Sequence, residues 1–204
     1  DERVPQEPRV VKPLHMQGRY GGTARIPFSG NPNEDWDLQL FFGADSPFGV
    51  TPDGQPGDPL VFRGYEVNDD YTEWIFHLRK GLKWSDGHPL TTKNFYQFWR
   101  YDRANTDISP GIKLKNVKIE ENKVTFTNEP GEGLEVGRVV TKEVIDDYTL
   151  RYTSPEPYPN LVHMMSNGWM IESWIEPMHY KLKFHPDIVG EETAKKRAQE
   201  AGFE

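Results

Sequence analysis

The segment from Trp74 to Thr92 constrains the fold more than any other part of the sequence. Its first residues carry apolar side chains at every second position, a period that is typical of a half-buried strand. Gly81 ends this run, and Ser85-Asp86-Gly87 predicts a tight turn, because glycine readily adopts a positive φ. Thr91 or Thr92 then caps a predicted helix. The strand residues are Trp74, Phe76 and Leu78, and the helix carries Phe95, Phe98 and Trp99 on one face. The segment therefore predicts a structural unit, not an active site.

Strand and helix patterns alternate along the rest of the chain, separated by turn residues. Strands are predicted at residues 24–28, 61–67, 73–79, 115–120, 123–127, 138–145 and 148–153, and helices at 92–102, 160–165 and 191–201. The dipeptides Glu121-Asn122 and Asp146-Asp147 predict two hairpin turns. A chain of this length and pattern can bury a substantial core.

The composition argues against several classes of function. The chain has 24 Lys and Arg against 32 Asp and Glu, a net charge of −8, and no basic cluster larger than Lys195-Lys196-Arg197. Nucleic acid is therefore not an expected partner. The sequence contains no cysteine, which excludes disulfides, thiol catalysis and cysteine metal sites. No apolar run approaches the roughly 20 residues of a membrane-spanning helix.

Titratable side chains form no evident catalytic or metal site. The six histidines lack metal-ligand spacing, so no metal and no cofactor is expected. Adjacent acidic residues lie in predicted turns or on a surface helix, where such pairs usually face water. A catalytic pair would have to converge across a cleft, which the sequence leaves open. The acidic pairs are Asp69-Asp70, Asp146-Asp147 and Glu191-Glu192.

Four blocks of sequence resemble family 5 of the extracellular solute-binding proteins of bacterial ABC transporters, in the order of that family. The most specific block runs from Phe76 to Thr91, F-H-L-R-K-G-L-K-W-S-D-G-H-P-L-T. The other blocks are Gly21-Gly22-Thr23 with Arg25, the segment 59–67, and Asp146-Asp-Tyr-Thr-Leu-Arg151 with Pro155-Glu-Pro-Tyr158. The resemblance covers about residues 20–204 and corresponds to the N-terminal portion of a family member.

This resemblance implies an α/β fold of the periplasmic-binding-protein type (type II, cluster C). The first lobe would hold a mixed sheet and carry a smaller α+β insertion, and the second lobe would be absent from these residues. The implied organisation is an extended N-terminal arm at 1–16, a first-lobe segment at 17–50, an inserted sheet-and-helix subdomain at 51–149 and a first-lobe continuation at 150–204. The boundaries are approximate.

The candidate ligand-binding residues lie in two places. By its order in the chain, the loop 35–45 matches the family's segment after the opening strand, where Phe41 and Phe42 could wall a cleft and Gly43 would allow close backbone approach. Ala44 and Asp45 complete this set, and Trp169 could stack on a sugar or an aromatic side chain. Alternatively, the segment 35–45 is a surface loop held in place by buried aromatic side chains. For Trp169, the alternative is that its side chain packs in the core.

The function implied is the substrate-binding component of an ABC importer, which captures a peptide or an oligosaccharide between two lobes and delivers it to a membrane permease. Such a protein is not an enzyme. It would be periplasmic or extracellular, with a membrane anchor in the precursor left open, and it is expected to be a monomer. The alternative is a glycoside hydrolase with an aromatic-lined cleft, and a third reading is a structural or interaction domain.

We expect these 204 residues alone to bind a ligand weakly or not at all, because the resemblance places one wall of the cleft in the second lobe. Calorimetry on this chain and on a protein that includes the second lobe measures the difference. Equal affinity in the two proteins would contradict the two-lobe interpretation.

Overall fold

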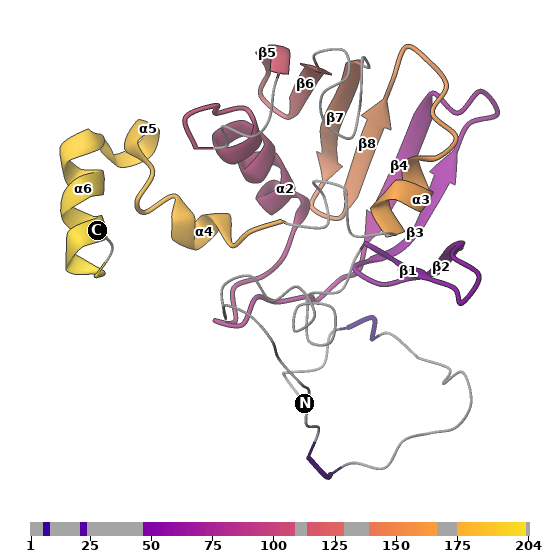
Figure 1. The fold of residues 1–204 in the computed structure, drawn as a ribbon, viewed down its shortest axis with the longest axis horizontal. Coiled ribbons are helices and arrows are strands. Elements are labelled where there is room, and N and C mark those ends of the chain that lie inside the picture. The colour runs from indigo at the N-terminus through magenta and orange to yellow at the C-terminus, as the bar shows by residue number, and fades with distance from the viewer. Residues whose placement is uncertain are drawn as a thin grey trace, which may run out of the picture.

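A six-stranded antiparallel sheet with helix α2 on one face forms the body of the molecule in the computed structural model, which describes residues 6–8, 21–23, 47–108, 114–128, 139–166 and 175–202 (Figure 1). The strand order is β3-β4-β8-β7-β6-β5. The strands are β3 (Phe62–Val67), β4 (Glu73–Leu78), β5 (Leu114–Ile119), β6 (Lys123–Asn128), β7 (Val139–Asp146) and β8 (Thr149–Thr153).

The remaining elements lie at the margins of this body. Helix α2 (Thr92–Phe98) continues into the π-helical turn η2 (Trp99–Arg103). A separate two-stranded hairpin consists of β1 (Phe48–Val50) and β2 (Pro56–Pro59), and helix α3 (Leu161–Ser166) packs against it. Three short helices follow, α4 (Met178–Lys181), α5 (Pro186–Val189) and α6 (Glu191–Glu200). Figure 1 shows α6 beyond α4, on the side away from the sheet.

Six of the predicted strands and the three predicted helices are confirmed, each to within about one residue at either end. The strand predicted at 24–28 lies outside the described residues. The sequence did not indicate β1, β2, α4, α5 or the π-helical form of η2. Within the described ranges, none of the helices has the length and apolar composition that crossing a bilayer requires.

The start of α2 is fixed by its own cap and by a neighbouring turn. Thr91 is the N-cap, and its backbone N–H donates to the side chain of Asn94 over 2.9 Å, which completes a capping box. The N–H of Thr92 donates to the carbonyl of Asp147, in the turn between β7 and β8, over 3.0 Å. The predicted N-cap is therefore confirmed, and the hairpin turn ties the helix to the sheet.

An aromatic cluster between α2 and the sheet forms the centre of the core. Phe76 on β4 lies beneath Phe62 on β3, with ring centroids 5.4 Å apart, and Phe62 in turn meets Phe95 on α2 at 5.7 Å. Trp99 meets Tyr152 on β8 edge-on at 5.8 Å. All five side chains are at most 1% exposed, so each contributes most of the transfer free energy of a large apolar group, about 1.5–3 kcal/mol.

A lysine lies on the core face of β7. Lys142 is 1% exposed because alternation along the strand places it on the same face as Val140 and Val144. Its ammonium lies 5.4 Å from the ring centroid of Phe126 and 5.3 Å from that of Tyr152. Both rings stabilise the charge by cation–π interaction, which is strongest in such desolvated places.

The predicted domain boundaries stay predictions. Strand β8 straddles the predicted boundary at 149/150 and pairs with both β4 and β7, so one sheet continues across it. Every described strand pair is antiparallel, and most of the segment 17–50, assigned to the first-lobe mixed sheet, lies outside the described residues. Of the N-terminal arm, residues 6–8 are described, and Glu7 contacts Lys80 and Arg63.

We expect Phe76→Ala to lower the free energy of unfolding by about 3–5 kcal/mol, because it empties the centre of the aromatic cluster. Ile75→Ala is the matched control, since Ile75 is the preceding residue of β4 and lies half-buried on the opposite face. Urea unfolding of both variants measures the difference. Equal losses would show that the two faces of β4 do not differ in packing.

Candidate functional site

The six predicted ligand-binding residues, Phe41, Phe42, Gly43, Ala44, Asp45 and Trp169, lie outside the described residues. The described chain resumes at Pro47, two residues after Asp45, and α3 ends at Ser166, three residues before Trp169. The structure therefore describes the parts of the fold to which both predicted segments attach.

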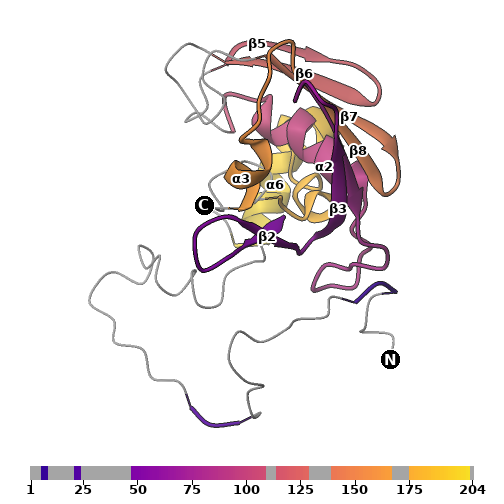
Figure 2. The same ribbon diagram turned by 90° about the vertical axis from the view of Figure 1, so that its right-hand side faces the viewer.

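Those two attachment points belong to one corner of the molecule. Helix α3 packs against both β1 and β2, and Figures 1 and 2 both show it beside this hairpin. We call the hairpin 47–59 together with α3 the attachment corner. Because three residues of chain span at most about 11 Å, Asp45 and Trp169 are each connected to this corner by a short tether.

The hairpin side of the corner is fixed by aromatic packing and by close backbone approach. Phe48 is 1% exposed, stacks on Phe62 with centroids 5.7 Å apart, and meets Tyr65 edge-on at 5.4 Å. A Cβ atom on Gly57 would lie 3.2 Å from the carbonyl carbon of Gly49, so the two strands approach each other more closely than a side chain there would allow.

The helix side of the corner is equally well packed. Leu161, Val162, Met165 and Ser166 are buried, and the Ser166 hydroxyl donates to the carbonyl of Val162 over 2.8 Å. Tyr65 remains 43% exposed beside Phe48. The corner is therefore well packed and lies beside an accessible aromatic side chain of β3. Tyr65 was not among the predicted site residues, because a lone tyrosine in a strand carries no functional signal in sequence.

The tight turn of the Trp74–Thr92 segment contacts the start of α4. His179 stacks on His88 with centroids 4.0 Å apart, and its Nε2 lies 2.7 Å from Oδ2 of Asp86. The hydrogen bond from His179, aided by one from the backbone N–H of His88, lowers the pKa of the Asp86 carboxyl below its usual value. Within the described contacts, Nδ1 of His179 and Nε1 of Trp84 are buried and have no hydrogen-bond partner.

A second junction joins α4 to η2 through charged groups. Nζ of Lys181 lies 2.8 Å from Oδ2 of Asp102, a carboxylate that is 5% exposed, and it also pairs with Glu176. Burial alone would lower the pKa of Lys181, but hydrogen bonds to the two carboxylates outweigh it and raise that pKa. This cluster holds elements together and leaves the lysine charged.

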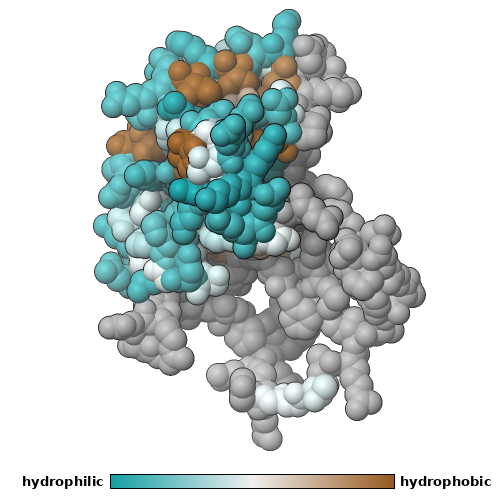
Figure 3. Space-filling model, turned by 90° about the vertical axis from the view of Figure 1, so that its left-hand side faces the viewer, coloured by the Kyte–Doolittle hydropathy of each residue, from teal (hydrophilic) through white to brown (hydrophobic). Residues whose placement is uncertain are grey.

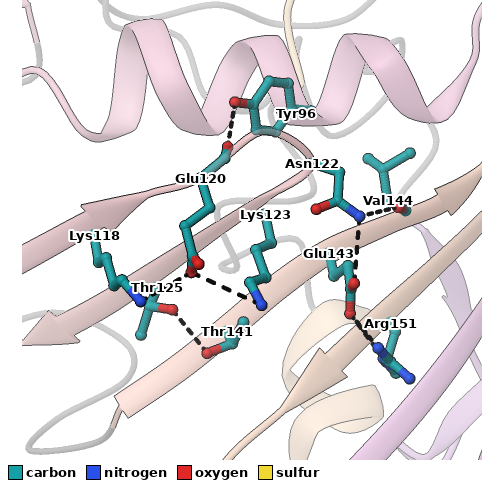
Figure 4. A network of polar contacts seen from close by, with 10 residues as sticks. All are labelled: Tyr96, Lys118, Glu120, Asn122, Lys123, Thr125, Thr141, Glu143, Val144 and Arg151. Carbon is teal, nitrogen blue, oxygen red and sulfur yellow. Dashed lines mark hydrogen bonds and ion pairs between the residues drawn. The ribbon is translucent and has the colours of Figure 1, made fainter.

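The face of the sheet opposite α2 carries a network of paired polar groups (Figure 4). Arg151 on β8 pairs with Glu143 on β7. Oε2 of Glu120 lies 3.3 Å from Nζ of Lys118 and 3.8 Å from Nζ of Lys123. The hydroxyls of Thr125 and Thr141 are 2.9 Å apart across β6 and β7. The Arg151–Glu143 and Thr125–Thr141 pairs link neighbouring strands and stabilise the sheet.

Of the acidic pairs considered for catalysis, one residue closes a turn and the others are exposed, including Glu191 and Glu192 on α6. Oδ1 of Asp146 accepts from the backbone N–H of Tyr148 over 2.8 Å, which closes the β7–β8 turn. Asp69, Asp70 and Asp147 are exposed in turns. Among the described residues, no group of three or more His, Asp or Glu is arranged to hold a metal ion.

Comparison with known proteins gives one family. Residues 58–200 match the family model described as "Bacterial extracellular solute-binding proteins, family 5 Middle". The periplasmic alpha-galactoside-binding protein of Rhizobium meliloti is 28% identical over 93% of this chain, and the periplasmic oligopeptide-binding protein OppA of Escherichia coli is 34% identical over 52% of it. A solved structure titled "oligopeptide-binding protein OppA" superposes with a TM-score of 0.71 at 28% identity and covers 96% of this chain.

The chain is much shorter than these relatives. It spans 27% of the length of the alpha-galactoside-binding protein and 19% of that of the Escherichia coli protein. It covers 27% of the OppA structure, so the likeness in fold concerns a fragment of one lobe.

We expect His179→Ala to raise the titration midpoint of the Asp86 carboxyl, because the strongest hydrogen bond to the ionised carboxylate is lost. His77→Ala is the matched control, since His77 pairs with Glu66 on the sheet and not with Asp86. Carbon-13 NMR titration of the carboxyl resonance measures both. An unchanged midpoint in the His179 variant would show that this contact does not form in solution.

Proposed function

Because the chain belongs to the bacterial extracellular solute-binding proteins of family 5, we propose that it is part of the substrate-binding component of an ABC import system. The observation that carries this proposal is the family match over residues 58–200, which includes the Trp74–Thr92 segment. The superposition on the OppA structure supports the same assignment at the level of fold. The activities named for the relatives belong to whole proteins, and this chain spans 27% and 19% of the length of the two described above.

Capture and delivery of a solute require a rigid wall and a moving one. The attachment corner supplies a rigid support for two segments that bear aromatic side chains, 41–45 and Trp169. A ligand held between this lobe and a second one shifts an open–closed equilibrium toward the closed form. Capture involves no covalent step. The closed form then docks on a membrane permease. The protein acts as a monomer in the periplasm or outside the cell.

The ligand belongs to one of two chemical classes that the relatives' names suggest, an oligosaccharide with α-galactoside linkages or an oligopeptide. An indole such as that of Trp169 offers a flat apolar face to a sugar ring or to a peptide's aromatic side chain. Gly43, which has no Cβ, would let a peptide backbone approach the loop closely. The glycoside hydrolase alternative is not favoured, since the family consists of transport binding proteins.

We expect the full-length protein to gain thermal stability from one ligand class and not from the other. A ligand that binds the folded state alone stabilises it by RT ln(1 + [L]/Kd), so the melting temperature rises with the ligand concentration. The probes are raffinose, which is an α-galactoside, and a tripeptide, each titrated in a thermal-shift assay. Native mass spectrometry of protein purified without denaturation identifies a ligand retained from the cell. No retained ligand and no shift with either probe class would count against both suggested ligands.

Trp169→Ala should then weaken binding of the effective probe by about tenfold, because it removes a stacking face. Tyr71→Ala is the matched control, since Tyr71 is an aromatic side chain 45% exposed in the turn before β4. Isothermal calorimetry gives both dissociation constants. Equal affinity in the Trp169 variant and the wild type would show that Trp169 does not contribute to ligand binding. That result would not contradict the proposed transport function.

A further inference from the structure

The last 28 described residues form an arm that contacts the body mainly at its base. We call residues 175–202, which contain α4, α5 and α6, the C-terminal arm. Of these residues, Met178 belongs to the buried core, and Ile175 and Leu182 pack against it. Helix α6 buries Ala194 alone, and the face on its side of the molecule is mainly hydrophilic (Figure 3). Apolar burial therefore holds the base of the arm and contributes little farther along.

Beyond that base, His185 makes a second contact between the arm and η2, in addition to the ion pair of Lys181 with Asp102. The side chain is 6% exposed and packs edge-on against the ring of Tyr101, with centroids 5.4 Å apart. Its Nε2 lies 2.9 Å from the backbone carbonyl oxygen of Tyr101. Its Nδ1 lies 3.2 Å from the backbone nitrogen of Asp187, so His185 is also the N-cap of α5.

These two contacts require one protonation state of the ring. A carbonyl oxygen can only accept, so the Nε2 atom must carry a hydrogen to donate to Tyr101. A backbone N–H can only donate, so the Nδ1 atom must present its lone pair to Asp187. The neutral imidazole with hydrogen on Nε2 satisfies both, whereas the protonated ring points a second hydrogen at the N–H of Asp187 and loses that capping bond.

The neighbouring charges do not remove this requirement. The Asp187 carboxylate lies 3.9 Å from Nδ1, but its side chain is 65% exposed and its attraction is screened by water. On η2, Asp102 is engaged by Lys181 of α4, and Arg103 lies 3.7 Å from the same carboxylate. Each of these charges is at least partly neutralised by an opposite one.

We propose that His185 is an acid-sensitive clamp, whose neutral ring holds the C-terminal arm on η2 and whose protonation loosens it. The lone pair of Nδ1 that caps α5 is lost when that atom takes up a proton, so the clamp weakens as the pH falls. The inference does not depend on the proposed transport function. The arm is the two-state element, and the lost N-cap bond is the local change that biases it.

The other arm histidine provides an internal contrast. Nε2 of His179 faces the carboxylate of Asp86 at 2.7 Å, so its contact with the body is made to an acidic group and not to a backbone carbonyl. The two histidines therefore differ in the partner of Nε2, and a variant of each separates their contributions.

Hydrogen exchange of the full chain at about pH 7.5 and about pH 5.5, normalised to the intrinsic rates of unstructured peptides, tests the proposal. We expect protection of the amides in 178–200 to fall about fivefold at the lower pH relative to the sheet, the factor that corresponds to one lost hydrogen bond. His185→Gln, which cannot titrate, should abolish this pH dependence, and His179→Gln should retain it. A pH-independent wild type, or a His185→Gln variant with the full pH effect, would overturn the clamp.

A measurement on the wild type alone guards against a variant that fails to fold. Nitrogen-15 NMR of the imidazole reports which ring nitrogen carries hydrogen. We expect hydrogen on Nε2 and none on Nδ1 of His185 at about pH 7.5, with the arm amides protected. Hydrogen on Nδ1 while those amides stay protected would equally overturn the proposal.

Discussion

The packing of α2 on the aromatic face of the sheet is the interaction on which the other features depend. Phe62, Phe76 and Phe95 form one continuous contact from β3 through β4 to the helix, and Trp99 extends it to Tyr152 on β8. The same cluster reaches Phe48 in β1, whose ring stacks on Phe62. Removal of this contact would therefore affect both the sheet and the attachment corner, because a close-packed interior transmits displacement from one side chain to the next.

Two parts of the molecule with a proposed role are attached to this cluster, the attachment corner and the C-terminal arm. On one side, the attachment corner supports the tethers of the two predicted ligand segments. On the other, η2 presents Tyr101 and Asp102 to the C-terminal arm, where polar contacts replace apolar burial. π-Helical turns often occur at functional places, and this one turns the end of α2 toward the arm.

Local patterns predicted much of the secondary structure and little of the contacts between distant elements. The period of two in β4, the cap at Thr91 and the two hairpin turns are short-range features, and each was confirmed. Lys142 was missed as a core residue, because a lysine in an alternating strand looks exposed until both neighbouring strands are placed. His185 and Lys181 were missed because their partners lie about 80 residues earlier in the chain. The predicted ligand residues lie outside the described residues and stay predictions.

The sequence by itself determined the strands of the sheet. The residues of the Trp74–Thr92 segment also carried the family resemblance that the comparisons confirmed. Hydrogen bonds within a strand, a turn or a helix cap involve neighbours in the chain, so residue types and spacing suffice to predict them. The tertiary structure alone decided that α3 lies against β1 and β2, and that His185 lies between Tyr101 of η2 and the start of α5. These contacts arise between residues that only folding brings together, and their chemistry depends on burial and on distances that no local pattern contains.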